Sequence, residues 1–189
     1  MTLRVLVAGL AGGIVMFVWG FVFWAVLPLP KMYLPATPHE AALRKALDDA
    51  LPASGTYVFP SRTQESDDTM KARYAEGPVG TIAFHKGGVD MEDPTIFVKG
   101  LLHFIACSTI AAGIMSTVIG SLRSYGSRVL FVFRLGLFAG VAIEFAKTIW
   151  FYAPTDFILL NCAYHFTGWG LVGLAIARIV KPAAAPAAV

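Results

Sequence analysis

Residues 5–27 read VLVAGLAGGIVMFVWGFVFWAVL, an apolar run inside a stretch of 26 uncharged residues between Arg4 and Lys31. Because a helix rises about 1.5 Å per residue, roughly 20 apolar residues are enough to cross the hydrocarbon core of a bilayer. The run is therefore predicted to be a transmembrane helix. It is longer than the apolar region of a signal peptide, which is about 7–15 residues, and this favours a retained anchor.

Three more apolar runs follow, at Gly100–Leu122, Val129–Tyr152 and Phe157–Ala177. The predicted fold is an all-α membrane protein, a bundle of four transmembrane helices. The predicted organisation is a first transmembrane helix in residues 1–28, an extracytoplasmic loop in 29–98, transmembrane helices 2–4 in 99–181, and a disordered Ala/Pro tail in 182–189.

The composition supports a membrane protein over a soluble one. Hydrophobic residues make up 57% of the chain and charged residues 14%, and the mean hydropathy is +0.67. A soluble domain carries about 25% charged residues. A globule of this size cannot bury so much apolar surface, so the excess is expected to face membrane lipids.

The distribution of charge predicts the orientation of the helices. Basic residues unaccompanied by acidic ones occupy one set of span ends: Arg4, Arg123, Arg128, Arg134, Arg178 and Lys181. The positive-inside rule then places both termini in the cytoplasm and residues 29–98 outside it. No organelle-targeting segment is visible, so the expected membrane is a bacterial inner membrane. Topology and anionic lipid explain the basic residues, and nucleic acid is not expected as a partner.

The loop is predicted to contain a short helix and a two-stranded hairpin. Thr37-Pro38-His39-Glu40 has the pattern of a capping box, which would open a helix that runs to Leu51. Thr56–Phe59 and Val79–His85 alternate like strands that can pair, and the polar stretch Ser61–Met70 between them is expected to be mobile. So little structure cannot build its own core, so support is expected from the helical bundle or from a partner protein.

Small residues recur at four-residue spacing in the apolar runs. Gly9 and Gly13 form one such pair, and Gly136 and Gly140 form another. These stripes allow close approach of two helices in a membrane, and they predict helix packing and not an activity. The partner helix can belong to the same chain or to another one.

Polar side chains inside the predicted spans gather in the outer half of the membrane. They are His103, Cys107, Glu144, Lys147, Asn161, Cys162 and His165. Glu144 continues the stripe of Gly136 and Gly140 by one step of four, and it should face another helix. Lys147 is within reach of Glu144 for an ion pair along the helix. Self-neutralisation of this pair is the favoured interpretation, and a proton, quinone or ligand site is the alternative.

Two pairs in this group have the spacing of metal ligands. His103 and Cys107 share one helix face, and Cys162 and His165 share another, so together they could form a tetrahedral site for zinc or copper. Alternatively, His103 and His165 could bind a haem between helices. Base rates favour an apolar role for cysteine and interfacial hydrogen bonding for histidine, so neither cofactor is the leading expectation.

The motifs of common enzymes are missing from the sequence, among them the Walker loop, HExxH and GxSxG. An enzyme is thus not the favoured interpretation. The leading hypothesis is a non-catalytic accessory or assembly subunit that binds other integral membrane subunits or copies of itself. The second is a small redox or ligand-binding membrane protein that uses the polar cluster for haem, metal or quinone. The third is a small oligomeric transporter or channel, which the lack of an inverted repeat disfavours.

Overall fold

The computed structural model describes residues 2–61 and 66–182. Four of its helices are long and apolar enough to cross a membrane: Leu3–Val26, Thr95–Thr117, Tyr125–Phe151 and Thr155–Ile179. The first consists of α1 (Leu3–Phe21) and a π-helical turn, η1 (Val22–Val26), and the others are α5, α6 and α7. These four helices match the four predicted spans, which is compatible with an integral membrane protein. The predicted disordered tail, apart from Pro182, lies outside the described residues.

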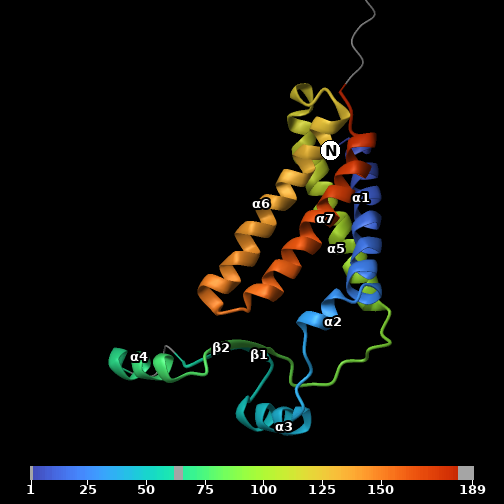
Figure 1. Ribbon diagram of the computed structural model, residues 1–189. Helices are drawn as coiled ribbons and strands as arrows, with labels where there is room; N and C mark the ends of the chain where they lie inside the picture. The colour runs from blue at the N-terminus through green and yellow to red at the C-terminus, as the bar shows by residue number, and fades with distance from the viewer. Residues whose placement is uncertain (1, 62–65, 183–189) are drawn as a thin grey trace, which may run out of the picture.

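The long helices pack in the order α5, α1, α7 and α6. Helix α1 packs against both α5 and α7, and α6 packs against α7, whereas α5 and α6 touch each other little (Figure 1). Met16, Met115, Val132 and Val172 are at most 2% exposed and form part of the core that these contacts bury. The short helix α2 (Leu29–Tyr33) follows η1, and the short helix η2 (Ile119–Ser121) lies between α5 and α6. The end from which residues 27–94 project is called the loop end below (Figure 1).

The predicted glycine stripes contact helices of the same chain. A Cβ added at Gly9 would lie 2.8 Å from Cα of Thr109, and one at Gly13 would lie 2.6 Å from Cα of Ile105, so these glycines allow α1 to approach α5. On α6, a Cβ at Gly136 would collide with the Trp169 side chain of α7, and one at Gly140 would lie 2.9 Å from Cε1 of Phe166. The close approach that the stripes predict is therefore made between helices of one chain.

Besides α2, the loop contains two strands and two longer helices. It projects from one end of the long helices (Figure 1). Strand β1 (Gly55–Phe59) pairs antiparallel with β2 (Gly80–Phe84), with Gly55 opposite Phe84 and Phe59 opposite Gly80. This confirms the predicted hairpin. Helix α4 (Asp67–Glu76) lies between the strands. The expectation of a mobile stretch at Ser61–Met70 is thus wrong from Asp67 onward, and residues 62–65 lie outside the described chain.

Helix α3 (Glu40–Ala50) begins two residues later than the predicted capping box requires. Thr37 Oγ1 accepts a hydrogen bond from the backbone nitrogen of His39 at 3.3 Å and does not cap the helix. The threonine therefore stabilises the turn before α3, and the helix starts at Glu40, whose acidic side chain suits the positive end of the helix dipole.

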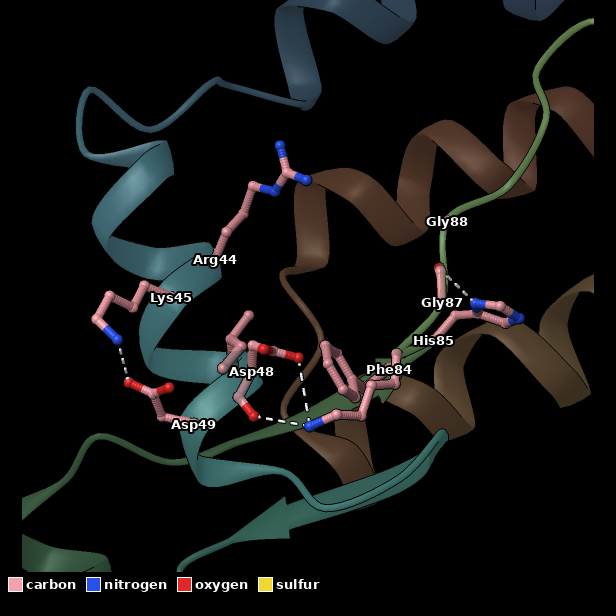
Figure 2. Close-up of a pocket in the computed structure, with 10 residues that line it drawn as sticks. Arg44, Lys45, Asp48, Asp49, Phe84, His85, Gly87 and Gly88 are labelled. Carbon is pink, nitrogen blue, oxygen red and sulfur yellow. Dashed lines mark hydrogen bonds and ion pairs between the residues drawn. The ribbon is translucent and has the colours of Figure 1, made fainter.

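Lys86 fixes α3 to the hairpin in a loop whose described helices α3 and α4 contain no buried residue. Its Nζ donates hydrogen bonds to the backbone oxygens of Asp48 and Leu51, both at 2.8 Å, at the C-terminal end of α3. The same Nζ lies 3.3 Å from Oδ1 of Asp48. Figure 2 shows the hollow at this junction, with Asp48 of α3 close to Phe84 of β2. Lys86 therefore holds α3 against β2 where no buried side chains do so, because its ammonium group bonds carbonyl groups that the end of a helix leaves free.

Replacing Lys86 with methionine should loosen α3 without affecting the long helices. The two hydrogen bonds are charge-assisted but partly exposed, so a loss of about 1 kcal/mol is expected, which corresponds to roughly fivefold faster hydrogen exchange in residues 40–51. Lys45→Met is the matched control, because among the described residues Lys45 pairs with Asp49 of its own helix, at 2.9 Å, and not with the hairpin. Equal exchange rates in the two variants would contradict this role of Lys86.

Candidate functional site

Three of the predicted polar residues meet near the loop end of α6 and α7. Glu144 Oε1 lies 2.8 Å from Nζ of Lys147, so the predicted ion pair along α6 is present. The same oxygen lies 3.7 Å from Nε2 of His165 on α7. Glu144 faces α7 because it continues the stripe of Gly136 and Gly140, along which α6 approaches that helix.

Glu144 is buried, and one of its carboxylate oxygens has no partner in the described chain. The residue is 4% exposed, and Oε2 makes no hydrogen bond with any described residue. By contrast, 48% of the Lys147 side chain is exposed, so the lysine reaches Oε1 from the surface. A buried polar atom without a hydrogen bond costs about 1–3 kcal/mol. Such an atom is a common sign of a bound partner or of a functional group.

A cavity of about 320 Å³ adjoins this carboxylate. Its polar lining comes from three helices, namely His103 and Cys107 of α5, Glu144 of α6 and His165 of α7. Its apolar lining includes Met16 of α1, Phe104 of α5 and Trp169 of α7. The volume is at the lower end of the range typical of small-molecule sites, about 300–1,000 Å³.

His103 and Cys107 line the cavity wall opposite Glu144, on the other terminal helix of the row. The Cys107 sulfur lies 3.8 Å from Nε2 of His103 and 4.0 Å from its Nδ1. These long separations mark a weak contact between two groups that share a helix face, as their spacing predicts. Both side chains therefore keep polar atoms that another molecule in the cavity can contact.

The structure does not assemble the predicted zinc or copper site. Cys162 is buried, and neither Cys162 nor Asn161 is among the described residues that line the cavity. Asn161 Nδ2 donates to the Phe157 oxygen of its own helix at 3.0 Å. Nowhere in residues 2–61 and 66–182 do three or more His, Cys, Asp or Glu side chains stand where they could hold one metal ion. Residues at i and i+3 are about 60° apart around a helix, so His165 can line the cavity while Cys162 packs elsewhere.

Sequence patterns did not predict the apolar residues that line the cavity. Phe104 and Trp169 are ordinary residues of apolar helices, and no local pattern separates a cavity-lining aromatic side chain from a core one. Trp169 contacts Gly136, one of the predicted packing residues. A large residue opposite a glycine stripe could have indicated Trp169 as a cavity residue. It can be recognised only when the pairing of the helices is known.

A second hollow, of about 530 Å³, lies in the loop between α3 and the end of β2 (Figure 2). Four of its charged side chains already pair with each other, because Lys86 bonds Asp48 and Lys45 bonds Asp49. His85 places Nδ1 2.8 Å from the Gly87 oxygen. Arg44 also lines the hollow. Pairs of this kind at an exposed surface contribute little energy, so the hollow is a weaker candidate than the cavity at Glu144.

Comparison of the chain with protein-family models, with curated proteins and with solved structures found no match. The cavity at Glu144 and the exposed surface of the loop are therefore the features of this chain that point to a function.

Proposed function

We propose that this chain is an integral membrane protein that binds a small ligand in the cavity at Glu144, through a hydrogen-bond donor on that ligand. The observation that carries the proposal is Glu144, a buried carboxylate with one unpartnered oxygen among the described residues, which lines a cavity together with His103 and His165. The proposal adopts the ligand-binding hypothesis that the sequence placed second, and it assigns Glu144 as the residue that contacts the ligand.

Several features support a membrane location with the cavity in the outer half. Phe138, Ile110 and Leu102 are 60–75% exposed on the long helices, as lipid-facing residues are. Basic residues at the end opposite the loop favour cytoplasmic termini. In that orientation Glu144 lies in the outer half of a bacterial inner membrane, where water is scarce and a ligand would be the main source of a hydrogen bond.

The chemistry of the site favours a donor over a metal cation. Lys147 compensates the charge of Glu144 at Oε1, so the pair is close to neutral overall. The Glu144 carboxylate keeps one oxygen without a hydrogen bond among the described residues. A hydroxyl or N–H group of a ligand would supply a donor to this carboxylate. Haem or a transition metal remains a prediction that the same purified sample tests, by its optical spectrum and by metal analysis.

The test is extraction of small molecules from protein purified in mild detergent, followed by mass spectrometry. Wild-type protein is expected to carry a compound near one equivalent, and Glu144→Leu is expected to retain at least tenfold less of it. Asn161→Leu is the matched control, because Asn161 lies near the loop end of α7 and its side-chain hydrogen bond among the described residues stays within that helix. Equal amounts of every extracted compound in wild type and Glu144→Leu would overturn the proposal.

A role as an accessory subunit is a second proposal, and the loop favours it. Met91 is 92% exposed, Val89 is 68% exposed and Leu43 is 48% exposed, in a segment without a core of its own. These side chains suit a partner protein, whereas the glycine stripes no longer support one because α5 and α7 cover them. A tagged pull-down from native membranes should recover defined membrane subunits with wild type and fewer with Met91→Glu. Recovery of the chain alone from both would count against this role.

A further inference from the structure

An apolar groove between α5 and α6 adjoins the cavity at Glu144. This groove, of about 250 Å³, shares Cys107, Ala139 and Trp169 with the cavity. Away from the cavity it is lined by apolar side chains that include Ile110, Ile114 and Leu135. The shared residues make the two hollows neighbours along one path, polar at Glu144 and apolar beyond Trp169.

The groove exists because α5 and α6 stand at opposite ends of the row of long helices and touch little. About three helical turns, roughly 16 Å, separate His103 from Ile114 along α5. Because α5 runs from Thr95 to Thr117, the path starts in the half of this helix near the loop end and runs past its middle. A lipid that enters from the leaflet on the loop side would lie along this path, with its head at Glu144 and its tail along the groove.

The charge and the shape of the cavity limit which lipid head groups can bind there. The Glu144–Lys147 pair has no net charge, and the carboxylate can still accept a hydrogen bond. Such a site suits a neutral hydroxyl group and disfavours a phosphate. Phe104 and Trp169 line the same cavity. Aromatic side chains of this kind favour a flat aromatic head through edge and offset contacts.

Building on the proposed function, we propose that the ligand is a quinol-type lipid, a hydroxylated aromatic ring on an apolar tail. Its hydroxyl group donates to the carboxylate of Glu144, its ring lies against Phe104 and Trp169, and its tail follows Ile110 and Ile114. The reduced form binds more tightly than the oxidised quinone, because only the reduced form carries a hydroxyl donor for this carboxylate.

The test is a titration of the full chain, in detergent, with decylubiquinol under anaerobic conditions, with decylubiquinone and with dioctanoylglycerol, monitored by native mass spectrometry. Decylubiquinol is expected to bind at least tenfold more tightly than the other two. This preference should be lost in Glu144→Gln, which replaces one carboxylate oxygen with a donor. Tighter binding of the quinone or of dioctanoylglycerol would overturn the quinol assignment.

The tail is tested separately with Ile110→Trp, which adds bulk to the groove. Its matched control is Leu102→Trp on the same helix, because Ile110 is 63% exposed and Leu102 is 60% exposed. Ile110→Trp should weaken decylubiquinol binding about tenfold relative to Leu102→Trp. If the two variants bind equally while Glu144→Leu still loses the extracted compound, the groove inference fails and the proposed function stands. If Glu144→Leu also retains that compound, both fail.

Discussion

Replacing Gly13 with alanine is expected to lower the free energy of unfolding by about 3 kcal/mol, the upper part of the range for overpacking a tight core. The added Cβ would lie 2.6 Å from both the Cα and the backbone nitrogen of Ile105. Backbone atoms cannot rotate away as a side-chain tip can, so α1 and α5 would have to separate along their whole contact. The measurement is reversible unfolding in mixed micelles with increasing SDS, followed by circular dichroism.

Gly113→Ala is the matched control for this prediction, because it makes the same change in the long helix that faces Gly13. A Cβ at Gly113 would meet no described atom within 4 Å. Alanine should therefore be tolerated there, and it could stabilise α5 by up to about 1 kcal/mol through its higher helix propensity. Similar losses at the two positions would show that the α1–α5 contact at Gly13 does not control the response.

The features that sequence predicted well are those that depend on neighbours along one helix or strand. The four long helices follow from runs of apolar residues, which need no knowledge of the fold. The ion pair of Glu144 and Lys147 follows from their spacing, because residues three apart lie on one side of a helix. The pairing of β1 with β2 follows from the alternation of side chains in the two segments, although α4 lies between them.

The features that sequence did not predict depend on which helices are neighbours. Spacing placed Cys162 and His165 on one broad face, but only the position of α6 decides that His165 reaches Glu144 while Cys162 does not line the cavity. The groove between α5 and α6 is invisible for the same reason, because it results from the order of packing. The π-helical turn η1, with Leu27 N bonded to Val22 O at 2.9 Å, also has no signal in the apolar run.

Arg128 follows the positive-inside rule and also forms buried hydrogen bonds that stabilise the fold. It is one of the basic residues that predicted cytoplasmic termini, yet it is only 6% exposed. Its Nε donates to the Ala177 oxygen at 3.1 Å, near the end of α7. Its Nη1 donates to the oxygens of Leu122 and Arg123, at 3.2 Å and 3.0 Å, in the turn before α6. Helix ends leave such carbonyls without partners and carry partial negative charge, so a buried guanidinium joins three segments there.

Arg128→Met is accordingly expected to lower the free energy of unfolding by about 3 kcal/mol, since it removes three charge-assisted hydrogen bonds whose energies overlap. Arg128→Lys should recover less than half of that loss, because an ammonium lacks the planar fork that reaches carbonyls on two sides. Arg134→Met is the matched control: it removes the same charge from the same helix, and Arg134 is exposed with no hydrogen bond or ion pair to the described residues. It should change stability by less than about 0.5 kcal/mol. Comparable losses in both methionine variants, measured by the same SDS titration, would mean that positive charge at this end stabilises the protein, and that the contacts of the buried guanidinium do not.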